Sequence, residues 1–162
     1  MGFFDRLFGT KQSGIEIGAP LAGRCVPLSE VPDPTFADEI LGPGAAIIPT
    51  DGHIYAPASG TITTLFPTGH AVAITTGQGV EVLIHIGLDT VGLKGAAFTI
   101  LASEGQTVKQ GDLLIEADLE AISAAGLNPI TPVLICNADQ FQSVSPVTGQ
   151  TVAPGDTILR LK

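Results

Sequence analysis

Two histidines are the residues of this chain whose type and spacing suggest chemistry. His70 directly precedes the stretch AVAIT (71–75), and His85 lies near the end of the stretch VEVLIHI (80–86). Both stretches are short, apolar and rich in β-branched residues, which is typical of β-strands. Two strands so close in sequence predict a hairpin, and its register decides whether the two imidazoles meet.

The residues that join these strands set the register. Gly77 and Gln78 fit a two-residue loop of type II′, which favours Gly at its first central position. This loop places His70 directly opposite His85, with Cβ atoms about 5 Å apart on one face of the hairpin. A slip of one residue would place the two rings on opposite faces. We expect Val72, Ile74 and Leu83 beside the histidines, and Ala71, Ala73, Val80, Val82, Ile84 and Ile86 in the core.

Several interpretations of the histidine pair are open at this point. If its face is open, it is an apolar patch with two imidazoles at its centre, and such patches usually mark a docking surface, with or without chemistry. If the face is covered, the histidines are buried structural residues that bond to neighbouring carbonyls. Together with Asp89 they could instead form the three-ligand site of a zinc hydrolase of the peptidoglycan-endopeptidase type. Against the hydrolase, the chain shows no export signal and no His-x-His pairing.

Composition narrows the class of protein. A length of 162 residues suits one domain. The 16 acidic and 7 basic residues give a net charge of −9, which argues against nucleic-acid binding and favours partners with a positive patch. Cys25 and Cys136 form neither a disulfide framework nor a CxxC motif, so a reducing cytoplasm is expected. No signal peptide and no apolar run near 18 residues is present, which predicts neither secretion nor membrane spanning.

The chain repeats itself, which indicates how these strands are assembled. The segments APLAG (19–23), APASG (56–60) and SPVTG (145–149) share Pro and Gly at the same spacing. GQTVKQGDLLIEAD (105–118) and GQTVAPGDTILRLK (149–162) share GQTV, a Gly-Asp turn and an apolar strand. Two copies are too few for a solenoid, so we expect two related halves folded onto each other. This pattern is similar to the barrel-sandwich hybrid motif of biotinyl and lipoyl carriers.

Most other segments are predicted to be strands. Twenty Gly and twelve Pro separate short apolar runs, and helix signals are few. Asp33, Asp118 and Asn137 are candidate N-caps for short helices over 35–41, 119–125 and 138–141. The predicted fold is an all-β antiparallel sandwich, or barrel-sandwich hybrid, with a few short helical turns. The remaining predicted strands are 23–28, 45–49, 53–57, 61–66, 113–117, 132–136 and 157–161.

The N-terminal residues 1–14 are predicted to be a flexible arm, and residues 15–162 a single domain. The apolar residues of the arm fall on one stripe of a short helix. One interpretation of this stripe is an amphipathic helix that forms on contact with a membrane surface. The alternative is a frayed arm, because isolated helices this short are marginal in water. The apolar residues are Phe3, Phe4, Leu7 and Phe8.

The stretch GVEVLIHIGLDTV (79–91) closely resembles the signature of the glucose-family enzyme IIA proteins of the bacterial phosphoenolpyruvate-dependent sugar phosphotransferase system. The resemblance continues through LFPTGHA (65–71), VPDPTFAD (31–38), the segment GQTVKQGD and the terminal GDTILRL, and spans about residues 15–161. The His-x-Gly-x-Asp-Thr core, with a Thr-x-His upstream of it, is highly specific. Lys94 does not match the lysine motif of biotinyl or lipoyl carriers and is interpreted as a solvated loop charge.

This resemblance implies a phosphocarrier, that is, a protein-histidine phosphotransferase component of class EC 2.7.1. His85 would accept a phosphoryl group from the phosphohistidine of HPr and pass it to a Cys on the IIB domain of a glucose-type sugar permease. His70 would stabilise the phosphoryl oxygens, and Thr68 would orient His70. A neutral imidazole, with a reference pKa of about 6.5, keeps a lone pair for attack on phosphorus. No nucleotide motif is present and no cofactor is expected, although His70 and His85 could share zinc with a partner.

The resemblance also implies a docking surface and further partners. Asp33 and Asp89 would meet an Arg of the partner, although Asp33 is also a candidate helix cap. Pro34-Thr35 and Leu83 replace bulkier residues of enterobacterial members, so the affinity for partners is expected to differ.

Further expectations are regulation of non-PTS permeases, glycerol kinase and adenylate cyclase, and a cytoplasmic location with contact to the inner face of the membrane. His53 is predicted to be a solvated turn residue. The apolar ring that docks partners would be Phe36, Ile40, Leu41, Phe66, Leu83 and Val91.

Overall fold

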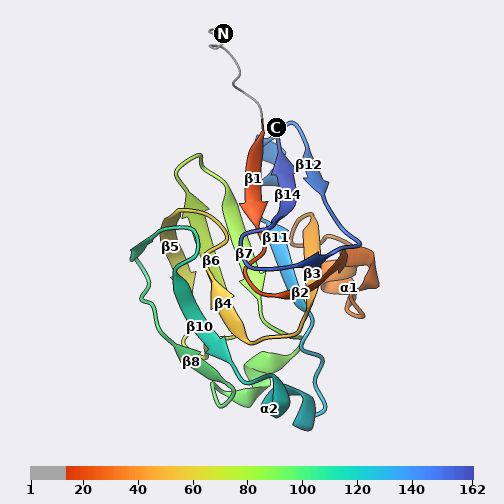
Figure 1. Ribbon diagram of the computed structural model, residues 1–162, viewed down its shortest axis with the longest axis vertical. Coiled ribbons are helices and arrows are strands. Elements are labelled where there is room, and N and C mark those ends of the chain that lie inside the picture. Colours follow the sequence, from red (N-terminus) through yellow and green to blue (C-terminus); the bar gives the residue numbers. More distant parts are fainter. Residues whose placement is uncertain (1–13) are drawn as a thin grey trace, which may run out of the picture.

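The computed structural model describes residues 14–162, so the predicted N-terminal arm lies outside the described residues apart from Gly14. The described chain is built from short strands (Figure 1). Strands of the first half of the sequence are β1 (Ile15–Gly18), β2 (Gly23–Pro27), β3 (Gly44–Pro49), β4 (His53–Tyr55), β5 (Gly60–Leu65), β6 (Ala71–Thr76) and β7 (Glu81–His85). Strands of the second half are β8 (Phe98–Ile100), β9 (Thr107–Val108), β10 (Leu113–Ala117), β11 (Thr131–Ile135), β12 (Val144–Pro146), β13 (Thr151–Val152) and β14 (Thr157–Leu161).

The strands form three antiparallel sheets with a symmetric order. The largest sheet has eight strands in the order β13-β2-β3-β11-β7-β6-β5-β9, and two smaller sheets have the orders β1-β14-β12 and β4-β10-β8. The first smaller sheet and the strands β13, β2, β3 and β11 form one half. The other half consists of the second smaller sheet and the strands β9, β5, β6 and β7. Each strand of one half has a counterpart at the same position in the other half, for example β2 and β5 in the large sheet. The predicted all-β fold of two related halves is confirmed.

Hydrogen bonds between the repeated segments follow this symmetry. Ala19 donates to the carbonyl of Asp156 at 2.7 Å, and Ala56 donates to the carbonyl of Asp112 at 2.8 Å. The two Gly-Asp turns that contain these aspartates therefore contact equivalent alanines of APLAG and APASG. The third segment, SPVTG, occupies no equivalent place, because it begins within β12 and ends before β13.

Two further hydrogen bonds join the halves reciprocally. The amide of Gly18 donates to the carbonyl of Pro57 at 2.9 Å, and the amide of Tyr55 donates to the carbonyl of Pro20 at 2.7 Å. Gly18 and Tyr55 precede the two repeated Ala-Pro pairs, so each half binds the other in the same way. The two halves are thus joined by hydrogen bonds and share one core.

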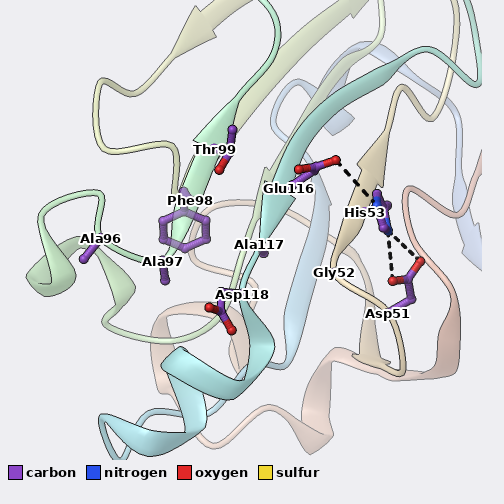
Figure 2. Close-up of a pocket in the computed structure, with 10 residues that line it drawn as sticks. All are labelled: Asp51, Gly52, His53, Ala96, Ala97, Phe98, Thr99, Glu116, Ala117 and Asp118. Carbon is purple, nitrogen blue, oxygen red and sulfur yellow. Dashed lines mark hydrogen bonds and ion pairs between the residues drawn. The ribbon is translucent and has the colours of Figure 1, made fainter.

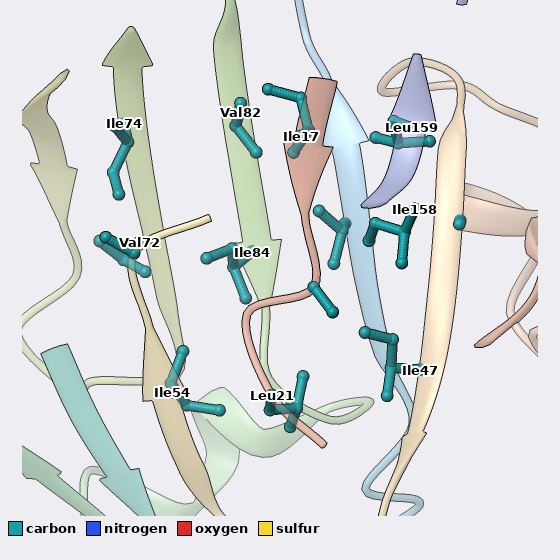
Figure 3. Close-up of a cluster of buried hydrophobic side chains, with 14 of the residues drawn as sticks. Ile17, Leu21, Ile47, Ile54, Val72, Ile74, Val82, Ile84, Ile158 and Leu159 are labelled. Carbon is teal, nitrogen blue, oxygen red and sulfur yellow. The ribbon is translucent and has the colours of Figure 1, made fainter. Parts of the chain in front are cut away.

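The core between the sheets is aliphatic, as a chain with few aromatic residues requires. Burying such side chains stabilises the fold by roughly 1.5–3 kcal/mol each. Figure 3 shows side chains from both halves packed against one another. The members with labels there are Ile17, Leu21, Ile47, Ile54, Val72, Ile74, Val82, Ile84, Ile158 and Leu159.

The register of the β6–β7 hairpin differs by one residue from the predicted one. Ala71, not His70, lies opposite His85, and Val72 lies opposite Ile84. The loop has three residues and ends at Gly79, whose φ of +84° only glycine adopts freely. A three-residue loop of this kind is the next most common after the two-residue loop that the sequence favoured.

The corrected register changes which side chains accompany the histidines. Val72 and Ile74 were predicted beside them but are buried in the core. Ala71 and Ala73 were predicted in the core but lie in register with His85 and Leu83, on the other face of the hairpin. Ala71 is nevertheless buried there, as predicted, whereas Ala73 is only half-buried.

The helices are shorter than predicted, although two of the three predicted caps are confirmed. Helix α1 (Pro34–Ala37) begins where the Asp33 carboxylate accepts a hydrogen bond from the amide of Thr35 at 3.0 Å. Helix α2 (Leu119–Ala124) begins where Asp118 accepts one from Ala121 at 3.0 Å. One-turn 3₁₀ helices span Leu28–Glu30, Thr90–Leu93 and Ala138–Gln140. No helix within residues 14–162 has the length and apolarity needed to span a bilayer.

Asn137 is the predicted cap that the structure contradicts. Its side chain makes no cap hydrogen bond to the helix that follows. Its amide oxygen accepts from the backbone of Glu81 at 2.9 Å, and its amide nitrogen donates to the carbonyl of Gly79 at 2.8 Å. Asn137 therefore holds the loop end of the β6–β7 hairpin.

Candidate functional site

The two histidines lie side by side at the end of the β6–β7 hairpin. His85 is the last residue of β7, and His70 directly precedes β6. Their ring centroids are 5.3 Å apart, with planes at 79°. The rings meet although Ala71 is opposite His85, because the chain enters β6 through Gly69, whose φ is +79°. His70 therefore does not follow the alternation of the strand after it.

The ring of His85 is held by the backbone that follows it. Its Nδ1 lies 2.8 Å from the carbonyl oxygen of Gly87. A carbonyl only accepts hydrogen bonds, so Nδ1 carries the proton and donates it. The lone pair of the neutral ring is then on Nε2, at the far side of the imidazole. His85 thus has a nucleophilic nitrogen that this hydrogen bond leaves free.

The peptide group between Gly87 and Leu88 makes this arrangement rigid. The amide of Leu88 donates to the carbonyl of Asn128 at 2.9 Å. In a planar trans peptide the N–H and the C=O point in opposite directions. Anchoring the Leu88 amide to Asn128 therefore turns the Gly87 carbonyl towards the ring of His85.

The ring of His70 is held by a side chain. Its Nδ1 contacts the hydroxyl of Thr68, two residues earlier. A hydroxyl can donate or accept, so this contact fixes the orientation of the ring, with Nε2 directed away from Thr68. The His70 residue is only 6 % exposed. The structure thus brings Thr68, His70 and His85 into one cluster.

Aromatic rings flank the pair on both sides. Phe66 lies 5.0 Å from His70, and Phe36 lies 5.0 Å from His85, measured between ring centroids. Phe36 is 4 % exposed and packs in a second core cluster together with the half-buried Leu83. These contacts restrict the rotation of both imidazoles and keep water from their faces.

Burial sets the protonation of both rings. Desolvation lowers the pKa of His85, and this effect exceeds the opposing influence of the Gly87 carbonyl and of the charges on Asp33 and Asp89. Desolvation, and then the proximity of His85, lowers the pKa of His70. Both rings are therefore neutral at pH 7, which is the state required for a nitrogen nucleophile.

A shallow pocket of about 210 Å³ opens beside His85. It is bordered by two carboxylates, Asp33 and Asp89, and by apolar side chains. The neighbouring Ile40 is 68 % exposed, and exposed apolar residues that gather around one pocket are typical of contact surfaces. Other exposed apolar side chains among the predicted docking residues are Leu41, Phe66 and Val91. The pocket is lined by Asp33, Thr35, Phe36, Leu41, His85, Asp89 and Val91.

His53 lies outside this cluster, in a second pocket of about 330 Å³ (Figure 2). Its Nδ1 bonds to Asp51 at 2.9 Å, and its Nε2 lies 3.6 Å from Glu116. His53 begins β4 and so is not the turn residue that was predicted, but its side chain is 44 % exposed and therefore solvated, as expected. Lys94, in contrast, is an exposed residue directly after a 3₁₀ turn, as predicted.

The zinc-hydrolase interpretation finds no support in the described geometry. Within residues 14–162, no group of three or more His, Cys, Asp or Glu side chains is arranged to hold a metal ion. His70, His85 and Asp89 therefore do not form the three-ligand site that this interpretation needs.

Backbone groups and one threonine complete the site, and the sequence analysis assigned no role to them. The carbonyls of Gly87 and Asn128 orient His85, and Thr90 lies buried beneath Gly87. Thr90 belongs to the recognised His-x-Gly-x-Asp-Thr core, so the motif was a signal for it. Asn128 is 43 residues beyond His85, and no pattern in the chain connects the two.

Comparison with known proteins identifies relatives over the whole chain. Residues 15–141 match the family described as "phosphoenolpyruvate-dependent sugar phosphotransferase system, EIIA 1". The chain is 41 % identical to the glucose-specific EIIA component of the phosphotransferase system of Haemophilus influenzae, covering 100 % of this chain and 99 % of that protein. It is 46 % identical to the β-glucoside-specific EIIBCA component of Halalkalibacterium halodurans, over 90 % of this chain and 23 % of that protein.

A solved structure agrees with these matches. The glucose permease IIA of Mycoplasma capricolum superimposes with a TM-score of 0.87 at 34 % identity, over 96 % of this chain and all of that one. The chain therefore belongs to the EIIA 1 family of the phosphoenolpyruvate-dependent sugar phosphotransferase system and is a phosphocarrier, a transferase component of that system.

Proposed function

We propose that His85 is the phosphoryl acceptor and that Nε2 is the atom that attacks. The lone pair on Nε2 forms a new P–N bond while the P–N bond in the phosphohistidine of HPr breaks, and the electron pair of that bond returns to the donor imidazole. The observation that carries this assignment is the hydrogen bond from Nδ1 to the Gly87 carbonyl, 2.8 Å long, which reserves Nε2 for attack. The phosphoryl group then passes to a cysteine thiolate of a IIB domain.

His70 and Thr68 stabilise the transferred group in this proposal. If the Thr68 hydroxyl donates to Nδ1 of His70, then Nε2 of His70 carries a proton and donates a hydrogen bond to a phosphoryl oxygen. Phosphoryl transfer depends mainly on in-line positioning and on stabilising charge on the equatorial oxygens, so one aimed donor is an appropriate contribution. His70 would act in both the acceptance and the onward transfer.

The surface around His85 would receive both partners in turn. Its apolar residues Ile40, Leu41 and Val91 are exposed, and Asp33 and Asp89 border the pocket. An apolar centre with an acidic rim fits a partner with an apolar patch and a basic side chain such as Arg. Glucose is the sugar that the names of two of the three relatives above suggest for the permease downstream.

Phosphotransfer from labelled phospho-HPr tests the assignment. The wild type should gain acid-labile label, His85→Ala should gain none, and His70→Ala should gain label but fail to pass it to a IIB domain. His53→Ala is the matched control, because His53 lies in the other pocket and should behave as the wild type. Label on the His85 variant would refute the proposal.

The remaining expectations of the sequence analysis stay predictions. In this proposal the chain holds no cofactor, and zinc would bind between His70 and His85 only with ligands from a partner. Regulatory binding to other permeases, glycerol kinase or adenylate cyclase is tested by pull-down with wild type and with His85→Asp as a mimic of the phosphorylated form. Equal recovery in both states would contradict a switch controlled by phosphorylation.

A further inference from the structure

Thr90 is a fully buried polar residue beneath the loop that orients His85. Its exposed fraction is 0 %, and its hydroxyl donates to the carbonyl of Ile86 at 2.5 Å. Its methyl carbon lies only 2.6 Å from the place where a Cβ on Gly87 would stand. Thr90 therefore contacts both residues of the Ile86–Gly87 peptide bond. Its hydroxyl contacts Ile86, and its methyl group packs against Gly87.

Gly87 is held between two anchored peptide groups. In the Ile86–Gly87 peptide, the Ile86 carbonyl is fixed by the Thr90 hydroxyl. In the Gly87–Leu88 peptide, the Leu88 amide is fixed by the Asn128 carbonyl. Gly87 itself has a φ of +78° and no side chain, so without these anchors it would be among the least restricted residues of the loop. The direction of its carbonyl, which accepts from His85, is set by the two planes together.

We propose that Thr90 is a positioning residue for phosphoryl acceptance. Its hydroxyl holds the Ile86–Gly87 peptide in the orientation that directs the Gly87 carbonyl at Nδ1 of His85, and so selects the tautomer with a free Nε2. Without this hydroxyl only the Asn128 anchor remains, so the Gly87 carbonyl is held less firmly towards Nδ1 and the tautomer protonated on Nε2 becomes more populated. That tautomer has no lone pair on Nε2 with which to attack. The inference rests on the proposed role of His85 as acceptor.

The tautomer of His85 is measured by ¹⁵N NMR of its ring nitrogens in the full-length protein. Thr90→Val removes the hydroxyl and keeps the shape of the side chain, whereas Thr90→Ser keeps the hydroxyl. The net strength of one hydrogen bond corresponds to a shift of about two- to tenfold in such an equilibrium. We expect Thr90→Val to lower the ratio of Nδ1-protonated to Nε2-protonated ring by this factor, and Thr90→Ser to restore it. The initial rate of labelling by phospho-HPr should fall and recover in parallel.

Thr76→Val is the matched control. Thr76 is also buried, and its hydroxyl accepts from the amide of Val80 at 3.1 Å, but it lies at the loop end of the hairpin, away from both histidines. This variant also loses a buried threonine hydroxyl, at the far end of the β6–β7 hairpin, so it measures the general effect of that loss. It should keep the wild-type tautomer ratio and labelling rate.

The outcomes separate this inference from the proposed function. A wild-type tautomer ratio and labelling rate in Thr90→Val would overturn the role of Thr90 and leave that of His85 untouched. Label on His85→Ala would instead overturn the proposed function. If Thr90→Val does not fold, Thr90→Ala provides the same test, because it also lacks the hydroxyl and introduces no larger group. An unchanged His85 tautomer in Thr90→Ala would equally overturn the inference.

Discussion

The three histidines of this chain differ in their surroundings, and these surroundings decide which of them is nucleophilic near neutral pH. Burial lowers the pKa of His85 and of His70. The hydrogen bond to Asp51, together with the charge of that residue, raises the pKa of His53. A protonated imidazole has no lone pair for attack. The depressed pKa values therefore keep the pair reactive at a pH where an unperturbed histidine would be half protonated.

A pH titration followed by NMR of the ring protons checks this difference. We expect His70 and His85 to titrate below 6.5 and His53 above it. Labelling by phospho-HPr should accordingly stay near its maximum as the pH falls through 6.5, provided that HPr itself is not limiting. A His85 ring that titrates at or above 6.5 would contradict the desolvation argument.

The same shifts predict the sign of the pH dependence of stability. Below 6.5 the unfolded chain binds protons on His70 and His85 that the folded protein does not bind. Their contribution to the free energy of unfolding is therefore complete above 6.5 and decreases as the pH falls below it. His53 has the opposite sign, because its contribution is present below 6.5 and is lost as the pH rises through its folded pKa. Urea unfolding of wild type and His53→Ala at several pH values separates the contribution of His53 from that of His70 and His85.

Residue types reveal the side chains of the site far better than its backbone. The residue pattern predicts the contact between His70 and His85, the family resemblance implies that Thr68 contacts His70, and the structure brings these three together. The carbonyls of Gly87 and Asn128 were not predictable, because every residue has a carbonyl and no pattern shows where it points. Which nitrogen of His85 is free depends on these backbone groups, so it could not be deduced from the sequence.

At the scale of elements, the hairpin shows how a site prediction can rest on an incorrect register. Loop residues 77–79 contain two glycines, and the sequence alone does not show which one takes the left-handed conformation. The type II′ loop requires a positive φ at Gly77, whereas in the structure Gly79 has the positive φ. The histidines meet in spite of this difference because Gly69 turns the chain at the other end of the strand.

Alanine substitutions at the two loop glycines distinguish these registers. A Cβ at either position would meet no atom within 4 Å, so steric overlap contributes to neither result. Gly79→Ala should destabilise the protein by about 1–2 kcal/mol, the cost of a left-handed backbone at a residue with a Cβ. Gly77→Ala should change the free energy of unfolding by less than about 0.5 kcal/mol. Thermal unfolding measures both, and the reverse order would support the two-residue loop.

Strand length explains why the shortest strands were missed. Longer apolar runs such as β7 and β11 were predicted to within one or two residues. The shortest strands, β9 and β13, have only two residues each and were missed as separate strands, although both lie within the recognised GQTV repeat. Two residues cannot show an alternating pattern, so their pairing depends on the neighbouring strands β5 and β2 rather than on local sequence.

At the scale of the whole molecule, the internal repeat gives the site a rigid base. The strands β7 and β11 pair at the centre of the large sheet, where the two halves meet. His85 therefore ends a strand that has hydrogen-bonded neighbours on both sides, β6 and β11. A central strand has little freedom to open locally. The acceptor is thus presented on a fixed element, and the proposed docking residues Ile40 and Val91 lie on connecting segments.

The final glycines of the two segments APLAG and APASG are predicted to be equally indispensable. Gly23 ends APLAG and Gly60 ends APASG, and both lie where a neighbouring strand approaches closely. A Cβ would stand 2.1 Å from the carbonyl oxygen of Ile48 in the first case and 2.2 Å from that of Thr75 in the second. Since backbone atoms cannot move aside as a flexible side chain can, Gly23→Ala and Gly60→Ala should each lower the free energy of unfolding by about 3 kcal/mol.

Urea unfolding of these two variants, with Gly77→Ala as a control that meets no neighbouring atom, tests whether the halves are equivalent. Matching losses would show that the two copies impose the same packing requirement, because the strand pairs β2–β3 and β5–β6 occupy corresponding places in the large sheet. A large loss for one variant beside a near-wild-type value for the other would show that only one copy still needs its glycine. The repeated Gly in the sequence would then be inherited from a duplication rather than required by the present fold.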